Sequence, residues 1–206
     1  MKQINAKTAG IAWQTALQYV ASEGHPVKDG EKDLKEAMNV FLTVEDTVSS
    51  DPILEQYADK EMIDWMRKNF LSKESVGNWG YSYGQRFTNF DGIDQIGAVI
   101  EKLKKNPDSK SATITLMDPK GDGAHMPCIV ALDFKIRGGK LMTTAFFRSQ
   151  DVGKKIYADI ICLGEIGKKI AEEVETEIGE LNILIVSLHF YEEDREKFSK
   201  LLKDNG

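Results

Sequence analysis

The sequence predicts a single α+β domain, residues 1–206, in which helices flank one main mixed sheet. A chain of 206 residues fits one domain, and 41% apolar with 29% charged residues suits a globular protein that buries a sizeable core. Several strand-like runs follow one another with no helix between them, whereas a doubly wound fold alternates strands with helices. These observations favour the α+β class.

The first half of the chain contains two helical patterns and one strand-like run. Residues 7–22 place apolar side chains at helical spacing, with Thr8 as a candidate N-cap. The charged residues 27–36 are either a solvated surface loop or an anion-binding loop that uses its lysines. Residues 37–44 (AMNVFLTV) indicate a buried strand, and residues 52–70 an amphipathic helix.

The middle of the chain combines a long loop with a helix and a strand. Residues 72–90 are rich in glycine and aromatic residues and predict a long ordered loop. Residues 93–105 repeat the helical pattern and stop at Asn106-Pro107. Residues 111–117 (SATITLM) indicate a strand, which a turn-rich link over 118–126 follows.

The centre of the predicted fold is a hairpin or meander. Apolar, β-branched residues 129–136 turn at Gly138-Gly139 into a second run, 141–147. The polar block 148–151 (RSQD) comes where this strand is expected to stop and a helix to open, a place where loops carry functional groups. The remaining expected elements are a helix over 160–176, a strand over 181–191 and a peripheral charged helix over 192–206.

Composition and charge argue against several classes of function. The net charge of −6 leaves no basic stripe for general nucleic-acid binding. The chain has no apolar run long enough to span a membrane, and its start (MKQINAKTAG) lacks the apolar region of a signal peptide. We therefore expect a cytoplasmic protein with no nucleic-acid or membrane partner. No Walker loop, G-x-G-x-x-G, Ser-His-Asp or metal-binding pattern is present, so no metal is expected.

Cys128 has two interpretations. A lone strand cysteine is most often a buried structural residue. Alternatively, Cys128 is a nucleophile, because it follows proline at a strand start and the chain offers Arg148 as a cation. A nearby cation stabilises the reactive thiolate form. The other cysteine, Cys162, has no metal-type spacing from Cys128, and both thiols are expected to be free.

A series of short motifs around these residues resembles the thymidylate synthase and pyrimidine hydroxymethylase family, in its short archaeal-type branch. The family patterns are P-C-H, Q-R-S-x-D, a later Asn or Asp, and H-x-Y. The matching segments here are Pro127-Cys128, Arg148-Ser149-Gln150-Asp151, Asp159 and His189-Phe190-Tyr191, preceded by Tyr83-Gly84-Gln85-Arg86, Asp94-Gln95-Ile96 and Pro107-Asp108-Ser109. The resemblance spans about residues 80 to 191 and implies a thymidylate-synthase-like fold.

The resemblance also implies a reaction. Cys128 would add to C6 of a pyrimidine nucleoside monophosphate, which makes C5 able to attack the one-carbon unit of 5,10-methylenetetrahydrofolate or of an archaeal pterin analogue. It further implies a cytoplasmic homodimer. The enzyme would be a one-carbon transferase.

Binding roles follow from the same resemblance. Arg148 and Ser149 would hold the nucleotide phosphate, a contact that suits a guanidinium. Asp151 would hold a pyrimidine carbonyl through its backbone amide and face the folate ring with its carboxylate. His189 and Tyr191 would hold the ribose hydroxyl.

Asp159 bears on which base is the substrate. Thymidylate synthases have Asn here, whose amide both donates to O4 and accepts from N3–H of uracil, whereas cytidylate hydroxymethylases have Asp. A carboxylate accepts from the cytosine amino group but faces uracil O4 with like polarity, at a cost of about 1–3 kcal/mol. The expected activity is therefore hydroxymethylation of dCMP or CMP, with methylation of dUMP as the alternative. Asp159 could instead, or in addition, N-cap the helix 160–176.

The chain departs from the family pattern at three places. Ile129 and Phe147 replace a usual His and Gln, so a third hypothesis is a non-catalytic nucleotide-binding protein. Lys110-Ser111 replaces the Arg pair that would reach the phosphate of the partner subunit. The clamp is then either weaker, with Lys110 alone, or shifted to the lysines of residues 28–35. Glu61 and Glu45 are candidates for the catalytic glutamate of the family.

Overall fold

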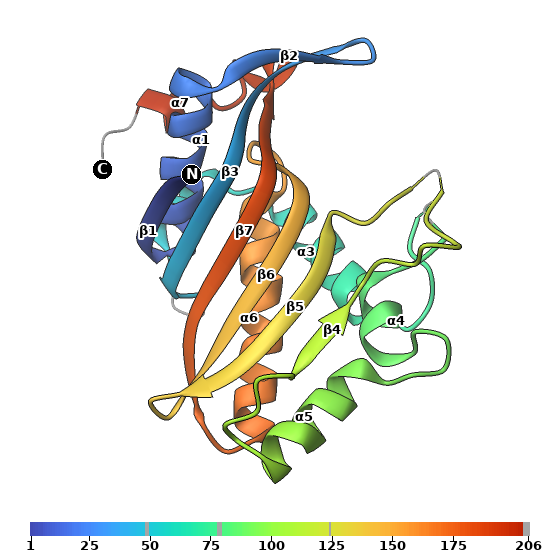
Figure 1. Ribbon diagram of the computed structural model, residues 1–206. Coiled ribbons are helices and arrows are strands. Elements are labelled where there is room, and N and C mark those ends of the chain that lie inside the picture. The colour runs from blue at the N-terminus through green and yellow to red at the C-terminus, as the bar shows by residue number, and fades with distance from the viewer. Residues whose placement is uncertain (48–49, 78–79, 124, 204–206) are drawn as a thin grey trace.

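A computed structural model describes residues 1–47, 50–77, 80–123 and 125–203. Among them, seven strands form one sheet in the order β1-β3-β7-β6-β5-β4, and β2 pairs with β3 outside this path. The pairs β1–β3 and β6–β7 are parallel and the others antiparallel. The predicted α+β class with one main mixed sheet is confirmed (Figure 1).

The elements follow the chain in a mixed order. The strands are β1 Lys2–Thr8, β2 His25–Asp29, β3 Lys32–Asp46, β4 Thr113–Thr115, β5 Ile129–Arg137, β6 Lys140–Asp151 and β7 Glu177–Tyr191. The helices are α1 Ala9–Glu23, α2 Pro52–Tyr57, α3 Lys60–Leu71, α4 Tyr83–Thr88, α5 Gln95–Lys105, α6 Ile156–Glu173 and α7 Ser199–Lys203, with a 3₁₀ turn at Glu192–Asp194.

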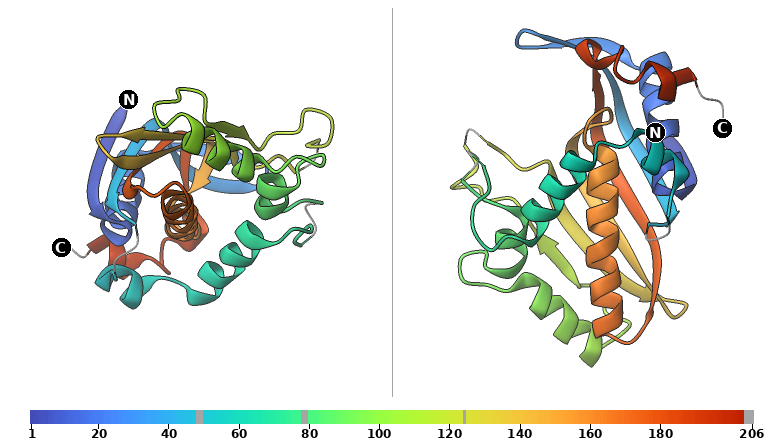
Figure 2. Two further views of the ribbon diagram at one scale, coloured as in Figure 1. Left: turned by 90° about the horizontal axis from the view of Figure 1, so that it is seen from below. Right: turned by 180° about the vertical axis from the view of Figure 1, so that it is seen from behind.

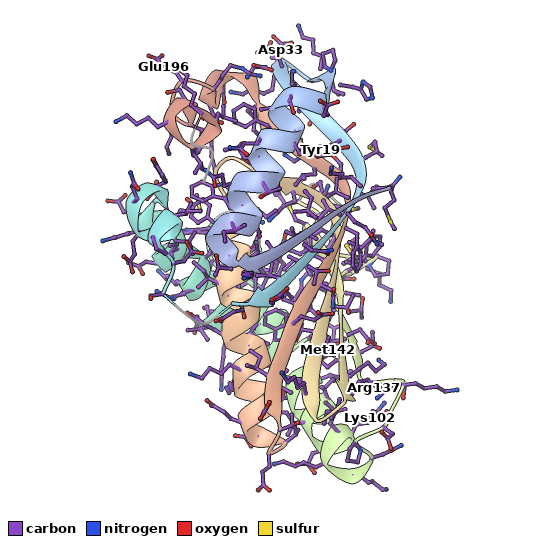
Figure 3. All side chains as sticks on the ribbon, turned by 90° about the vertical axis from the view of Figure 1, so that its left-hand side faces the viewer. Tyr19, Asp33, Lys102, Arg137, Met142 and Glu196 are labelled. Carbon is purple, nitrogen blue, oxygen red and sulfur yellow. The ribbon has the colours of Figure 1, made fainter. Side chains whose placement is uncertain are left out.

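Helices cover one face of the sheet. The views from below and behind show α1, α3 and α6 on that face, with α6 running along its middle (Figure 2). The core lies between this layer and the sheet, and its largest fully buried side chains include Trp13, Tyr157, Phe134, Phe147 and Phe190. The side view shows the helical layer to one side of the strands, and no helix of the described residues covers the opposite face of β3, β7, β6 and β5 (Figures 1 and 3).

The charged segment 27–36 is a β-hairpin, so its prediction as a loop was wrong. Residues of β2 pair with the start of β3 across Gly30, whose φ of 60° suits glycine at a tight turn. Lys28 faces Asp33 and Asp29 faces Lys32 across the ribbon. These opposite charges stabilise cross-strand pairs, which is why a charged sequence forms strands here.

The predicted helix over 52–70 is interrupted. The chain forms α2 and α3, separated at Ala58-Asp59, because Asp59 caps α3 by accepting from the backbone N–H groups of Glu61 and Met62. The predicted loop 72–90 contains α4, which Ser82 caps. Two residues of that loop, 78–79, and the end of the predicted tail helix, 204–206, lie outside the described residues.

The polar block 148–151 does not open a helix. It continues β6, because parallel pairing with β7 extends through Gln150 opposite Leu188 and Asp151 opposite His189. Helix α6 then begins at Ile156, earlier than residue 160. Asp159 therefore lies in the first turn of α6, and the position before the helix is Lys155, so the proposal that Asp159 is an N-cap was wrong.

The predicted peripheral helix over 192–206 was wrong: its described part forms a 3₁₀ turn and then the short α7, and it packs Phe198 and Leu201 into the core. The other elements largely match expectation. The predicted Thr8 cap, the helix 93–105 and the strands 129–136, 141–147 and 181–191 are confirmed, with small differences at their ends. The strand β1 was not predicted, because its polar residues alternate along an edge strand and carry little apolar signal.

Candidate active site

A two-lobed cavity lies where β5 begins and where β6 and β7 end. The smaller lobe, about 260 Å³, is lined by Tyr81, Tyr83, His125 and Met126 and by three residues that it shares with the larger lobe. The larger lobe, about 610 Å³, is lined mainly by residues of polar or charged type. The three shared residues are Cys128, Arg148 and Lys155, so the lobes meet at the thiol.

Cys128 is held at this junction by its backbone and its sulfur. Its N–H donates to Tyr83 Oη at 3.2 Å, and Ser149 Oγ donates to its Sγ at 3.8 Å. Cys128 is half-buried and lines the cavity, whereas Cys162 is buried, and burial raises the pKa of the Cys162 thiol. The accessible cysteine is therefore the one that sequence analysis selected as the candidate nucleophile.

Hydrogen bonds hold the side chain of Arg148 in the cavity that Cys128 lines. Its Nε donates to the carbonyl of Pro127 at 2.9 Å and its Nη2 to the carbonyl of Met126 at 2.7 Å. Its Nη1 donates to Ser149 Oγ at 3.2 Å. A continuous series of contacts thus runs from the guanidinium through Ser149 to the sulfur of Cys128. This arrangement stabilises negative charge on sulfur and presents a cation to an anionic ligand.

The larger lobe brings together the next three predicted residues. Asp151 lies opposite His189 in the β6–β7 pairing, and the rings of His189 and Tyr191 lie 5.2 Å apart. Burial lowers the pKa of His189, and the neighbouring Asp151 only partly opposes this. Burial raises the pKa of Asp151, and the hydrogen bond that its carboxylate accepts from the backbone N–H of Lys154 offsets only part of this rise. The imidazole is therefore favoured in its neutral form, which both donates and accepts hydrogen bonds.

Asp159 lies behind the cavity wall. Its side chain is 0% exposed, and its Oδ2 accepts from Gln150 Nε2 at 2.6 Å and lies 2.8 Å from Lys155 Nζ. Lys155 lines both lobes, but its Nζ is a buried atom, so the rest of the lysine side chain faces the cavity while the ammonium points to this carboxylate. Burial alone lowers the pKa of Lys155, but the attraction of Asp159, Cys128 and Tyr83 outweighs burial and raises it.

The other candidates lie elsewhere. Glu45 and Glu61 are exposed, and the glutamate that lines the larger lobe is Glu36, which accepts a short hydrogen bond from Ser187. Lys110 is exposed at the opposite end of β5 from Cys128, where the neighbouring Asp108 carbonyl accepts from Arg137. The chain does not bring Lys110 to its own cavity.

The β2–β3 hairpin contributes one of its three candidate lysines. Lys28 lines the larger lobe, whereas Lys35 donates to the carbonyl of Ala21 and Lys32 pairs with Glu193. Of the two interpretations of this segment, anion binding therefore has geometric support at Lys28 alone.

Sequence reasoning missed Lys155, Glu36 and the role of Tyr83. Lys155 and Asp159 stand four residues apart, a spacing that joins side chains on one helix face. That signal was hidden because the helix was expected to start at residue 160. Glu36 was hidden because its segment was read as a loop, and a strand pattern with period two would have placed it.

The matching segment 83–86 supports the cavity wall. A side chain at Gly84 would clash with the carbonyl of Ser72, so α4 packs closely against the end of α3. Arg86 forms a buried ion pair with Asp122, donating to its Oδ2 at 2.7 Å, and stacks 4.0 Å from the ring of Tyr81. The segment 94–96 is also structural: Asp94 caps α5, and Gln95 bonds the edge strand β4 at Thr115.

The described residues include neither a candidate metal cluster nor a candidate membrane-spanning helix. Residues 1–47, 50–77, 80–123 and 125–203 contain no group of three or more His, Cys, Asp or Glu side chains that could hold a metal ion. In the same part of the chain, no helix has both the length and the apolar character needed to cross a membrane.

Comparisons with known proteins point to one family. The family model described as thymidylate synthase matches residues 40–205. The "putative thymidylate synthase" of Methanosarcina barkeri is 31% identical over 204 residues, which cover 97% of this chain and 94% of that protein. That of Methanosarcina acetivorans is 32% identical over 205 residues, with the same coverage. That of Methanothermobacter marburgensis is 27% identical over 220 residues, 98% of both chains.

Proposed function

The chain belongs to the thymidylate synthase family, in its short archaeal-type branch, and from this premise we propose that Cys128 forms a covalent adduct with a pyrimidine nucleoside monophosphate during one-carbon transfer to C5. The family assignment makes the protein a one-carbon transferase. The observation that carries the proposal is the position of Cys128, accessible at the meeting point of two lobes and linked through Ser149 to Arg148.

The residues around Cys128 suit nucleophilic addition. The thiolate is the reactive form of cysteine, and Arg148 with Ser149 supplies the positive charge and the O–H that stabilise it. When Sγ bonds to C6, the electron pair of C5=C6 moves toward C5 and the adjacent carbonyl. C5 then bonds to the one-carbon unit and loses its proton, and Cys128 leaves as the C5=C6 bond re-forms.

The nucleotide would occupy the larger lobe. Arg148 and Ser149 would hold its phosphate, and Lys28, which lines the same lobe, would add a second cation from the hairpin. His189 and Tyr191 would hold the ribose hydroxyl, and Asp151 would meet the base and the donor. These roles, like that of Asp159, remain those that the family motif predicts.

The cavity also fits a flat donor. Tyr81, Tyr83 and Met126 give the smaller lobe an aromatic and apolar wall, the kind of surface on which a pterin ring stacks. Methylenetetrahydrofolate, or an archaeal pterin analogue, would supply the one-carbon unit there.

Two finer activities share this chemistry, and a different observation favours each. Hydroxymethylation of dCMP or CMP is favoured by Asp159 and Gln150, since Asp159 Oδ1 and Gln150 Oε1 are buried acceptors without a hydrogen-bond donor among the described residues. Methylation of dUMP is favoured by the name that the similar archaeal proteins share, putative thymidylate synthase. Water completes the first reaction, and a hydride from the donor completes the second.

Release of tritium from C5 tests the proposal. Labelled dUMP, dCMP and CMP are each incubated with the protein, with and without methylenetetrahydrofolate, and dihydrofolate is followed by its absorbance. We expect release from one base, and dihydrofolate only if that base is uracil. Cys128→Ala should lose release at least about a thousandfold. Release at the wild-type rate by Cys128→Ala, or none from any nucleotide, would contradict the proposal, and nucleotide binding without release would identify a non-catalytic protein.

The assembly is part of the same proposal. We propose that residues 1–206 form one domain and that two copies pair through the uncovered face of the sheet (Figure 1). Lys110 would then serve the phosphate of the partner subunit, since it lies far from its own cavity. A cytoplasmic location stays a prediction from the sequence.

A further inference from the structure

We propose that Glu36 determines which sugar the site accepts: its carboxylate accepts a hydrogen bond from the 2′-hydroxyl of a ribose, so that ribonucleotides bind in preference to deoxyribonucleotides. The inference rests on the proposed function and defines its substrate class by the sugar rather than by the base. Of the nucleotides considered under the proposed function, CMP is the one that carries this hydroxyl.

Glu36 lies in the wall of the larger lobe, beside the histidine that the proposed function assigns to the sugar. In the antiparallel β3–β7 pairing, Glu36 stands directly opposite His189. Both residues line the larger lobe. Directly opposite residues of an antiparallel pair have Cβ atoms about 4.5–5.5 Å apart. A sugar that His189 holds by one hydroxyl therefore lies within reach of the Glu36 side chain.

One oxygen of the Glu36 carboxylate is free to bind a ligand. Its Oε1 accepts a short hydrogen bond from Ser187 Oγ, another residue of the same lobe. Its Oε2 has no hydrogen-bond partner among the described residues, yet it does not belong to the polar atoms of those residues that are buried without a partner. Oε2 therefore keeps accessible surface on a side chain that lines the lobe, where a ligand can reach it.

A carboxylate distinguishes a hydroxyl from a hydrogen atom because it only accepts hydrogen bonds. Ribose carries an O–H group at C2′ that can donate to Oε2. Deoxyribose carries only hydrogen there, so it would displace water from the carboxylate without replacing the hydrogen bond. Hydrogen bonds to charged groups are stronger than those between neutral groups. A site that binds a hydroxyl in this way rejects the analogue that lacks it, and we expect a preference for ribose of at least about tenfold.

The charges in the lobe favour a nucleotide orientation that places the sugar, and not the phosphate, at Glu36. A phosphate is attracted to the guanidinium of Arg148 and repelled by a carboxylate. Arg148 and Ser149 line the same lobe and are joined by a hydrogen bond, so they form a site for the phosphate that is separate from Glu36. A neutral sugar meets no such repulsion at the carboxylate.

Asp151, the neighbour of His189 on its other side, is less suited to this role. It lies opposite His189 in the β6–β7 pairing, but its Oδ1 already accepts from the backbone N–H groups of Gly153 and Lys154. Burial also raises the pKa of Asp151, which weakens it as a charged acceptor. Of the two carboxylates beside His189, Glu36 is therefore the one that we expect to bind the second hydroxyl of the sugar.

Two substitutions remove the carboxylate in different ways. Glu36→Met keeps the length of the side chain without a strong acceptor, so it should abolish the preference for ribose. Glu36→Gln keeps the shape and the bond with Ser187 but presents a neutral amide, so it should lower the preference at least about threefold. Glu31→Gln is the control. It removes the same charge from an exposed position of the same hairpin, outside the lobe, and should leave the preference unchanged.

Calorimetric binding of CMP against dCMP, and of UMP against dUMP, measures the preference for both bases without the one-carbon donor. The base and the phosphate are the same within each pair, so the ratio of the two dissociation constants isolates the sugar. Circular dichroism checks that each variant is folded. We expect similar ratios in the two pairs for the wild type and for Glu31→Gln, and a ratio near one for Glu36→Met.

Equal affinities for ribonucleotides and deoxyribonucleotides in the wild type, or tighter binding of the deoxyribonucleotides, would overturn the inference. So would a preference for ribose that persists in full in folded Glu36→Gln, because another residue would then bind the 2′-hydroxyl. Failure of the proposed function gives a different result. Ribose-selective binding without release of tritium from C5 would refute catalysis and leave the role of Glu36 intact, whereas binding of none of the four nucleotides would refute both.

Discussion

At the scale of single residues, Arg148 shows how a strand presents two adjacent side chains to one site. Neighbouring residues of a strand point to opposite faces of the sheet, so Arg148 and Ser149 should diverge. They meet because the guanidinium bends back, and the carbonyls of Met126 and Pro127 hold it there. The segment before Cys128 is therefore part of the anion site through its backbone carbonyls.

The two apolar replacements in the family motifs, Ile129 and Phe147, form one contacting pair in the structure. Ile129 and Phe147 lie opposite each other in the β5–β6 pairing, and both are 0% exposed. A buried apolar pair is stable where a single polar partner would be left unsatisfied. The replacements are thus mutually consistent core residues, which weakens the argument that their loss marks a non-catalytic protein.

The charge state of His189 links stability to pH. Burial lowers its pKa from the ordinary 6.5, while Asp151 and Glu36 oppose the shift and Lys155 adds to it. As the pH falls below 6.5, the unfolded chain takes up a proton that the folded protein resists. The contribution of the neutral imidazole is therefore complete above 6.5 and is lost as the pH falls toward the lowered pKa.

We predict that His189→Gln loses less stability on acidification than the wild type. Denaturant unfolding from about pH 8 to about pH 5.5 measures the difference in free energy of unfolding between the two proteins. His25 and His125 occur in both proteins, so their effects on the pH dependence cancel in the comparison. The raised pKa of Asp151 acts in the opposite direction to that of His189, and the greater part of its effect cancels too. Parallel pH curves for the two proteins would show that His189 titrates as it does in the unfolded chain.

At the scale of elements, periodicity identified the strands and helices whose apolar residues face a core. The helix 93–105 and the strands on either side of Gly138-Gly139 follow from pattern alone. Two charged elements could not be found in this way. The β2–β3 hairpin is stabilised by pairing of opposite charges between strands, and the first turn of α6 contains Lys155 and Asp159 as a pair.

The candidate site was predictable to a similar degree. Motif order selected Cys128, Arg148, Ser149, His189 and Tyr191, and the cavity contains all five. A motif does not show how deeply a residue is buried, however, so the sequence could not show that Asp159 lies behind the cavity wall. That arrangement depends on the start of α6 at Ile156, which places Asp159 in the first turn of the helix.

The ion pair of Arg86 and Asp122 joins α4 to the turn that leads toward Cys128. Their side chains are 7% and 3% exposed, so removal of one partner leaves a buried charge. We predict that Asp122→Ala lowers the free energy of unfolding by about 3–5 kcal/mol. Glu173→Ala, which breaks an exposed pair with Lys104, should cost at most about 1 kcal/mol. Urea unfolding of both variants measures this, and equal losses would contradict the structural role of the buried pair.

At the scale of the whole molecule, the sheet has one covered and one uncovered face. A row of side chains crosses the uncovered face, since Phe41 lies opposite Leu184, Leu184 opposite Phe146, and Phe146 opposite Ala131. Phe146 is 36% exposed and Met38, on the same sheet, 52%. Contiguous apolar surface of this kind is typical of a protein interface.

A second copy of the chain is the partner that we expect on this face. Pairing would bury the row and would place Lys110 of each subunit nearer the cavity of the other, which its own chain does not reach. Phe146→Glu places a charge in the centre of the row, whereas Leu71→Glu places one at the end of α3, where Leu71 is 70% exposed on the helical side. We predict that analytical ultracentrifugation shows dimers for the wild type and for Leu71→Glu. The Phe146→Glu variant should weaken the dimer at least about a hundredfold. The same variant should also bind the nucleotide less tightly, because the partner's contribution to the site is lost with the dimer. A monomeric wild type would refute the pairing, and a monomeric Phe146→Glu variant with full nucleotide affinity would show that Lys110 has no role in the partner's site.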